Sequence, residues 1–513
     1  MGIGAAVAAA VPMPFCGARA QDPAAPAPRF GIEEVRRRAH DLAAAPFDAS
    51  IPNLDPVLAR LDFDAWRDIR FRPDKAFLAT PPSSFRLQTF HLGHLYKQPV
   101  TVNIIRDGIP APIPYSPSLF DYGRTRIERQ LPVNLGFAGF RLHFPLNSPK
   151  VFDEVIAFLG ASYFRVLGRN QNYGMSARGL SVGAGSAGGE EFPFFREFWV
   201  ETPEPGADRA TVYALLDGES ATGAFHIEVH PGAETILDIA VTLYPRRQLA
   251  AVGLAPLTSM FLSGENDRRV AGDFRPEVHD SDGLLIHSGT GEWIWRPLRN
   301  PAQMELSVFL ERDIRGFGLV QRDREFEHYQ DLDLGYERRP TYWVEPREGW
   351  GEGRIELVEL PTGDESNDNI VASFVPKRLL EPGSPFTYGY RLTARSLDSR
   401  LSPNGYVLNT YKTQARALGS VEAAPAGSAR FIIDFVGGEL PYFGNDPSHV
   451  EAVASVANGR VLRSFVAPNA HTGGFRAGLD VQAEPGQAAN LRVFLRSGEA
   501  ALTETWTFPW KAD

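Results

Sequence analysis

The sequence predicts an all-β protein, with a large antiparallel β-sandwich followed by a smaller immunoglobulin-like β-sandwich. Glycine and proline are abundant, at 48 and 41 residues, which favours many strands joined by tight turns. From about Phe85 onwards, apolar and polar residues alternate with a period of two, and clusters of Gly, Pro, Asp and Asn separate these segments. Because helical segments between the strands are lacking, antiparallel sheets packed face to face are expected.

The N-terminal segment differs from the rest of the chain. Gly2 to Pro14 is small and apolar, and Ala18-Arg19-Ala20 has the A-x-A form of a signal-peptidase site. We expect a secretion signal at residues 1–20 and a flexible lead-in, rich in Ala and Pro, at residues 21–29; a disordered Ala-rich tail is the alternative. Cys16 is the only cysteine, and its removal with the signal would suit an oxidising compartment.

The large domain is expected at residues 30–380. Apolar residues at helical spacing predict one short surface helix over residues 32–42, with Glu33 and Glu34 in its first turn. Alternating segments predict strands at residues 101–105 and 235–243. Residues 149–159 are expected to form a helix, because Val151, Val155 and Phe158 would share one face. The segment 178–190 holds five glycines, which predicts an exposed loop.

The immunoglobulin-like domain is expected at residues 381–513. Lys377 to Pro385 interrupts the strand pattern. Further on, Asn458-Gly459 lies between two apolar segments, residues 453–457 and 461–465, which is a strong signal for a β-hairpin with a type I′ turn. Two further alternating segments, residues 491–495 and 502–508, are expected to be strands. No cysteine remains to form the disulfide of antibody domains.

Charge and hydropathy restrict the class of partner. The formal net charge is −10 and the isoelectric point is near 5.7, so the chain has no basic surface suited to nucleic acid. After the N-terminal segment, no stretch reaches the roughly 18 apolar residues that a membrane-spanning helix needs. A neutral ligand is expected, and the mature protein should be soluble.

Two acidic clusters lie about ninety residues apart, Arg275 to Gly283 and Asp364 to Asn369. Cleavage of a glycosidic bond needs one carboxyl group that donates a proton and one that accepts it. Between the clusters, Tyr336 to Trp343 offers guanidinium groups and aromatic faces that can hold sugar rings. Acids, arginines and aromatics in this order indicate a carbohydrate site.

Structural interpretations of the same residues remain open. An acidic run such as Asp364 to Asn369 is typical of a solvated turn, and Asp280-Ser281-Asp282-Gly283 is compatible with a calcium-binding or turn motif, although it lacks the full EF-hand pattern. In an extended segment, Glu277 and His279 would face one way, and Asp280 and Asp282 the other. Spacing alone therefore leaves the identity of the base open.

Four segments resemble one family. Phe274 to Leu284 (FRPEVHDSDGL), Gly316 to Asp331 (GFGLVQRDREFEHYQD), Tyr336 to Pro346 (YERRPTYWVEP) and Asp368 to Ala372 (DNIVA) are similar to the periplasmic glucan biosynthesis proteins OpgG and OpgD, also called MdoG and MdoD. The resemblance extends from about Phe30 to the C-terminus, and it does not distinguish between the two proteins.

The resemblance implies a glycoside hydrolase acting on β-1,2-glucan in the periplasm. It places the general acid at Asp368 and favours Asp280 as the general base of an inverting mechanism. Tyr336 and Arg339 become expected contacts to the sugar at the cleavage point. Four further side chains complete the predicted site: Glu365, His279, Asp282 and Trp343. No cofactor and no metal are expected.

Two other functions stay open at this stage. The chain could be a non-catalytic glucan-binding partner of a membrane glucosyltransferase that controls backbone length or branching. It could also be a transglycosylase. Candidate partners are β-1,2-glucan, a membrane glucosyltransferase and a second copy of the chain.

Overall fold

The structure is a computed structural model that describes residues 1–2, 29–50, 54–79, 83–127, 131–132, 135–267, 272–396, 401–416, 419, 421–444 and 446–512. The expected secretion signal and lead-in lie almost entirely outside these residues. The described chain consists mainly of strands, which agrees with the predicted all-β class. None of its described helices is both long and apolar enough to cross a membrane.

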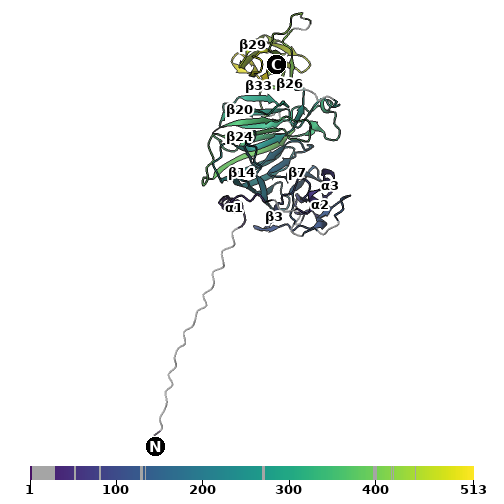
Figure 1. Ribbon diagram of the computed structural model, residues 1–513, viewed down its shortest axis with the longest axis vertical. Helices are drawn as coiled ribbons and strands as arrows, with labels where there is room; N and C mark the ends of the chain where they lie inside the picture. Colours follow the sequence, from purple (N-terminus) through teal and green to yellow (C-terminus); the bar gives the residue numbers. More distant parts are fainter. Residues whose placement is uncertain are drawn as a thin grey trace.

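Two large sheets form the body of the molecule (Figure 1). The short sheet has ten strands, in the order β2 (Arg86–Phe90), β6 (Gly139–Ser148), β7 (Val151–Leu159), β8 (Tyr163–Val166), β9 (Ser176–Arg178), β15 (Val252–Ser259), β24 (Ile370–Pro376), β23 (Glu352–Glu359) and β20 (Glu305–Arg312), with β10 (Ser181–Val182) beside β15. One apolar core contains inward-facing residues of this sheet, such as Phe140 and Val155, and of the second sheet, such as Val212 and Leu237. This shared core makes the two sheets a sandwich.

The second, long sheet has fifteen strands and extends into the C-terminal region. Its order is β28 (Glu451–Ala457), β31 (Ala488–Ser497), β33 (Thr505–Lys511), β19 (Trp293–Pro297), β18 (Gly283–His287), β21 (Gly316–Val320), β22 (Thr341–Pro346), β25 (Phe386–Arg395), β14 (Thr235–Pro245), β13 (Ala221–His230), β12 (Ala210–Asp217), β11 (Phe194–Glu201), β3 (Thr101–Arg106) and β4 (Ile109–Pro112), with β32 (Ala500–Ala501) beside β31. Strand β25 lies between β14 and β22. It therefore belongs to the large sandwich, although it follows residue 380.

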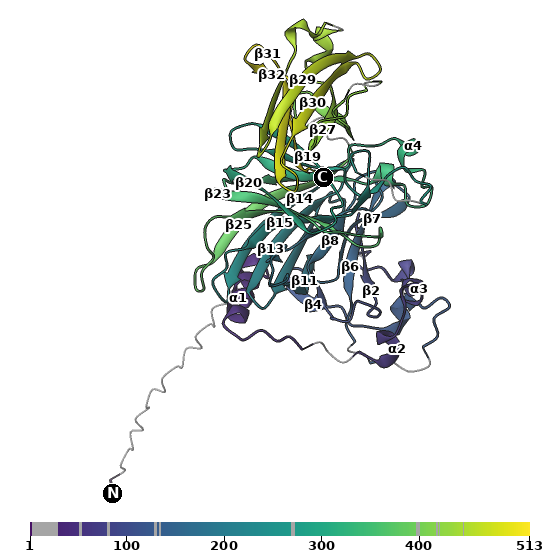
Figure 2. The same ribbon diagram turned by 45° about the horizontal axis from the view of Figure 1, so that its top comes forward.

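A smaller sandwich forms the C-terminal end (Figure 2). One of its sheets has four strands, β26 (Tyr406–Thr413), β27 (Ser428–Val436), β30 (Gly474–Gln482) and β29 (Arg460–Asn469), and the other is the β28–β31–β33 end of the long sheet. Strand β33 pairs in parallel with β19 of the large sandwich. The two sandwiches are thus joined by continuous backbone hydrogen bonding.

Short elements occupy the periphery. Helix α1 (Ile32–Ala43) packs on β12, β13 and β14, and its bounds confirm the predicted surface helix. The remaining helices are α2 (Pro56–Ala59), α3 (Phe63–Asp68) and α4 (Phe326–Tyr329), and the 3₁₀ turns are η1 (Pro73–Lys75), η2 (Pro117–Leu119), η3 (Tyr336–Arg338), η4 (Leu440–Phe443) and η5 (Pro447–His449). Two small ribbons complete the fold, β1 (Arg70–Phe71) with β5 (Phe120–Asp121), and β16 (Phe261–Ser263) with β17 (Val278–His279).

Three local predictions were wrong. Within residues 149–159, Val151–Leu159 form strand β7 rather than a helix; it lies between β6 and β8, and its second half, Val155 to Phe158, is buried. An apolar run with both faces covered does not reveal its period. The segment 178–190 is not wholly an exposed loop, since Arg178, Ser181 and Val182 are buried in β9 and β10.

The Asn458-Gly459 turn does not close a hairpin. Asn458 has the expected positive φ of 59°. However, β28 pairs with β31 and β29 pairs with β30, so the turn carries the chain from one sheet of the small sandwich to the other. Strands β31 and β33 confirm the prediction for the last two segments, and they pair with each other.

Candidate functional site

Asp368 is the last loop residue but one before β24, and the side chain of Asn369 fixes its position. The Asn369 amide donates to the carbonyl oxygens of Phe261 and Leu360 at 3.0 and 2.9 Å, and accepts from the Phe261 N–H at 2.8 Å. Its own N–H donates to the Ser259 carbonyl at 3.1 Å. These bonds attach the loop end to neighbouring strands, as the predicted loop-to-strand junction requires.

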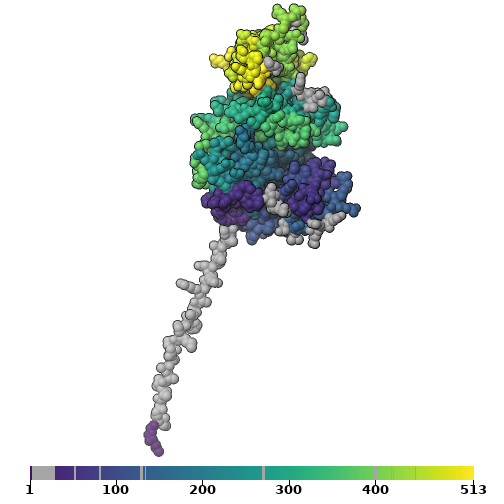
Figure 3. Space-filling view, viewed as in Figure 1, coloured from purple at the N-terminus to yellow at the C-terminus, as the bar shows by residue number. Residues whose placement is uncertain are grey.

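A pocket of about 400 Å³ extends from Asp368 across the short sheet. Figure 3 shows a recess between the purple N-terminal segment and the green segments, with blue residues at its floor. Six of its lining residues carry groups suited to a sugar: Tyr96, Glu154, Tyr163, Arg165, Tyr173 and Asp368. Aromatic faces, a guanidinium group and carboxyl groups therefore share one concave surface, which is typical of a ligand site.

The surroundings of Asp368 favour its protonated form. Burial raises the pKa of Asp368 above its usual value of 3.8, although Arg165, Arg178 and Arg339 oppose this shift. The residue is nevertheless exposed to solvent where the pocket opens. A carboxyl group that is surrounded by protein but reachable by a ligand can act as a proton donor.

Asp280, the predicted general base, forms an ion pair with Arg339. Both residues are nearly buried, at 5% and 7% exposure. The Arg339 guanidinium also lies over the Tyr336 ring, 3.7 Å from its centroid. Burial lowers the pKa of Arg339 to about 9, against the opposing effect of Glu365 and Asp368. Arg339 therefore stays charged at neutral pH, and its charge acts on both predicted catalytic carboxyl groups.

Tyr336 connects this centre to the loop of the second acidic cluster. Its hydroxyl donates to Glu365 at 2.9 Å, and Arg275 contacts the same Glu365 oxygen at 2.6 Å. Burial raises the pKa of Tyr336 well above its usual range. Tyr336, Glu365 and Arg275 come from three separate sequence motifs, and the fold brings them together.

His279 and Asp282 lie close to Asp280 in the chain, and their side chains bind other groups of the protein. His279 is fully buried, with Nε2 at 3.0 Å from Glu277 and Nδ1 at 2.9 Å from the Gln321 side-chain oxygen. The Gln321 amide nitrogen lies within hydrogen-bonding distance of three other oxygens, which occupy its two N–H groups. The Gln321 oxygen therefore faces the ring, and Nδ1 donates to it. Burial alone would lower the pKa of His279, but Glu277 and nearby acids raise it to about 9. The ring is thus an imidazolium cation.

Asp282 performs a structural task. One of its oxygens accepts from the N–H groups of Arg322 and Asp323, both at 2.8 Å. Burial raises the pKa of Asp282 to about 6. These bonds fix the chain that follows β21, close to the entry into α4.

Two predictions about the site require correction. Trp343 is 2% exposed and packs against Trp293 in the core that joins the sandwiches, so it does not line the pocket. His279 is fully enclosed and supports the site instead of facing a ligand. Tyr336 to Arg338 form the turn η3, and the Arg339 guanidinium that follows this turn lies over the Tyr336 ring.

Sequence reasoning missed the pocket residues of β7, β8 and the loop that follows β8. Tyr173 donates to Glu154 at 2.5 Å, and Arg165 donates to Ser176 at 2.8 Å. These residues form no compact motif. The alternation in Tyr163-Phe164-Arg165 could have indicated polar groups on one strand face, but not their position beside Asp368.

Comparisons with known proteins identify similar chains. A family model described as "Periplasmic glucan biosynthesis protein, MdoG" matches residues 30–510. The chain is 44% identical over 481 residues to the glucans biosynthesis protein G of Ralstonia nicotianae, covering 93% of this chain and 95% of that protein. It is 42% identical over 484 residues to the probable glucans biosynthesis protein D of Shewanella oneidensis, covering 94% and 88%.

Proposed function

The chain belongs to the MdoG family of periplasmic glucan biosynthesis proteins, and we propose that it acts in the periplasm on linear β-1,2-glucan as an inverting endo-glucanase. One observation carries the proposal. Arg339 pairs with Asp280 and also acts on Asp368, so a single guanidinium links two carboxyl groups in different surroundings. Such a difference is what divides acid and base roles between carboxyl groups.

In the proposed reaction, Asp368 donates its proton to the glycosidic oxygen as the bond to the anomeric carbon breaks. Asp280 accepts a proton from the attacking water, directly or through a sugar hydroxyl. Inversion, which the family resemblance implies, requires carboxyl groups about 6.5–9.5 Å apart so that water fits between them. The aromatic and polar lining of the pocket would hold the neutral chain.

The test is incubation of the purified protein with linear β-1,2-glucan, with reducing ends and product lengths measured over time. Asp368→Asn and Asp280→Asn should each reduce the rate by about 10²- to 10⁴-fold. Asp364→Asn is the matched control, because Asp364 is exposed in the same loop and its carboxylate accepts from the Ser366 N–H. Full activity of Asp368→Asn would refute the proposal.

Product analysis separates hydrolysis from transglycosylation. Hydrolysis gives one reducing end for each bond broken, and inversion gives an α-anomer first, detectable by NMR. New linkages without a matching increase in reducing ends would identify a transglycosylase.

One observation favours a second function. Asp280 is only 5% exposed and is already paired with Arg339, which suits a protein that binds glucan without cleaving it and acts with a membrane glucosyltransferase. That function predicts that the wild type binds the polymer but leaves it intact, and that Asp368→Asn binds equally well.

A further inference from the structure

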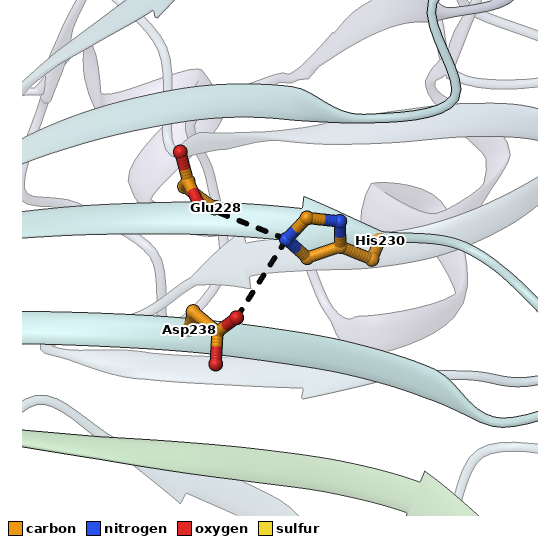
Figure 4. Close-up of side chains that lie close together, drawn as sticks. All are labelled: Glu228, His230 and Asp238. Atoms are coloured by element: carbon orange, nitrogen blue, oxygen red, sulfur yellow. Dashed lines mark ion pairs between the residues drawn. The ribbon is translucent and has the colours of Figure 1, made fainter. Parts of the chain in front are cut away.

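Three side chains converge on the outer face of the long sheet, away from the pocket: Glu228 and His230 of β13, and Asp238 of β14 (Figure 4). Their neighbours Ile227, Val229, Leu237 and Ile239 are buried in the core, so strand alternation turns this triad outwards. Its three ligand-capable atoms all lie within 4.8 Å of one another. The Glu-His-Asp triad has no role in the proposed glucanase reaction.

Strand register forces two like charges together. Glu228 and Asp238 are direct partners across the β13–β14 pair, and like charges placed directly opposite each other destabilise a sheet. A positive charge between the two carboxylates would remove this repulsion.

The His230 ring points to that position. Its Nε2 lies 3.8 Å from Glu228 Oε2 and 3.8 Å from Asp238 Oδ2. Both separations are too long for hydrogen bonds. Nε2 is shielded from solvent and has no hydrogen-bond partner in the described part of the chain. If the three side chains moved slightly closer together, the nitrogen and both oxygens would lie about 2.0–2.2 Å from a common ion.

The charges around the triad are compatible with a bound divalent cation. Arg391 donates to both Asp238 oxygens at 2.9 Å, and Arg347 also contacts Asp238. Glu345 lies opposite Arg391 on β22, and Glu348 lines the adjoining hollow of about 290 Å³. Four carboxylates thus surround two guanidinium groups, which leaves two negative charges when His230 is neutral. Each carboxylate oxygen has two lone-pair sites, so Arg391 does not prevent Asp238 Oδ2 from ligating an ion.

We propose that Glu228, His230 and Asp238 form a binding site for a divalent transition metal, with Zn²⁺ as the best fit to one imidazole nitrogen and two carboxylate oxygens. Water from the adjoining hollow completes the coordination. The site is independent of the glucanase proposal, because it lies on the other sheet of the sandwich from the pocket that contains Asp368.

The test is titration of the chelator-treated full chain with ZnCl₂ by calorimetry at neutral pH. We expect one site, with affinity reduced at least about 10- to 100-fold in His230→Gln and in Glu228→Gln. His471→Gln is the matched control, because His471 is exposed in the small sandwich. Near-UV circular dichroism checks that each variant is folded. Absence of binding, or unchanged binding in His230→Gln, would overturn the proposal.

Two further variants sharpen the result. A second group of potential ligands, Glu277, Asp323 and His328, lies near the proposed glucan site. If His328→Gln abolished zinc binding and His230→Gln preserved it, the assignment to the triad would be refuted. Glu228→Gln distinguishes metal binding from the mere removal of repulsion between Glu228 and Asp238. Without zinc it should raise the melting temperature by removing the cross-strand repulsion, yet it should abolish the further rise that zinc causes in the wild type. A zinc-induced rise that persists in Glu228→Gln would contradict the triad.

Discussion

At the scale of single residues, the protonation states of Asp368 and His279 are the features most open to measurement. The two groups owe their states to different causes. Burial dominates at Asp368, whereas hydrogen bonding to an acid overrides burial at His279. Each cause leads to a distinct dependence on pH.

We predict that kcat for glucan cleavage falls as pH rises through the pKa of Asp368. The general acid must be protonated, and burial raises its pKa above 3.8, so activity should extend above the pH range of an ordinary aspartate. A pH profile of kcat measures this decrease, which is the alkaline limb of the profile. A profile whose alkaline limb is unchanged in the residual activity of Asp368→Asn would assign the acid to another group.

We predict that His279 makes stability decrease between about pH 6.5 and pH 9, from its usual pKa to its raised one. A raised folded-state pKa contributes stability that is complete below the unfolded value and is lost as pH rises through the folded value. The contribution should be on the order of a few kcal/mol. Urea unfolding at both ends of this range measures it, and His279→Gln should flatten the difference. An equal slope in wild type and variant would show that other groups titrate.

At the scale of elements, the loop that ends at β24 depends on one amide side chain. Asn369 is 2% exposed and makes three side-chain hydrogen bonds to backbone groups of Phe261 and Leu360. The short distance between Asp368 and this anchor explains how an exposed acid keeps a fixed position.

We predict that Asn369→Ala costs about 1–3 kcal/mol of unfolding free energy, because buried backbone groups lose their partners. It should also lower kcat, since Asp368 loses its fixed position. Asn367→Ala is the control, because Asn367 is exposed in the same loop. Equal effects of the two substitutions on stability and kcat would refute the anchoring role.

At the scale of the whole molecule, a buried ion pair joins the two sandwiches. Arg322 makes two hydrogen bonds to Glu504, at 2.6 and 2.9 Å, and its guanidinium lies 3.6 Å from the centroid of a Trp295 ring. Glu504 is 1% exposed and also accepts from the Val407 N–H at 2.8 Å. The contact lies beside the β19–β33 pairing, so the sandwiches should unfold together.

We predict one calorimetric unfolding transition for the wild type and two for Glu504→Ala. Removing one partner of a buried pair costs about 3–5 kcal/mol, because the other charge stays buried. Glu451→Ala is the control, since its pair with Arg496 is exposed and should contribute about 0–1 kcal/mol. A single transition in Glu504→Ala, shifted no more than in the control, would show that the pair does not couple the sandwiches.

Local patterns were sufficient for several elements. Alternation predicted β3, β14, β31 and β33, and helical spacing predicted α1. In α1, β14 and β31 one face is covered and the other is exposed or partly exposed, so the burial period is visible in the sequence. Strands β3 and β33 are buried on both faces over four consecutive residues, but polar residues alternate with apolar ones there. The second half of strand β7, Val155 to Phe158, is buried without alternation, and its period was therefore misread.

The sequence by itself determined the all-β class, the loop-to-strand junction at Asp368 and the motifs that resemble a glucan biosynthesis family. These features depend on residues that are near one another in the chain. Only the tertiary structure paired Arg339 with Asp280 and brought it within electrostatic reach of Asp368, buried Trp343 between the sandwiches, and set Glu228 opposite Asp238. Such contacts depend on which strands pair and in what register, and the energies that decide this come from the packing of segments distant in sequence, which no local pattern records.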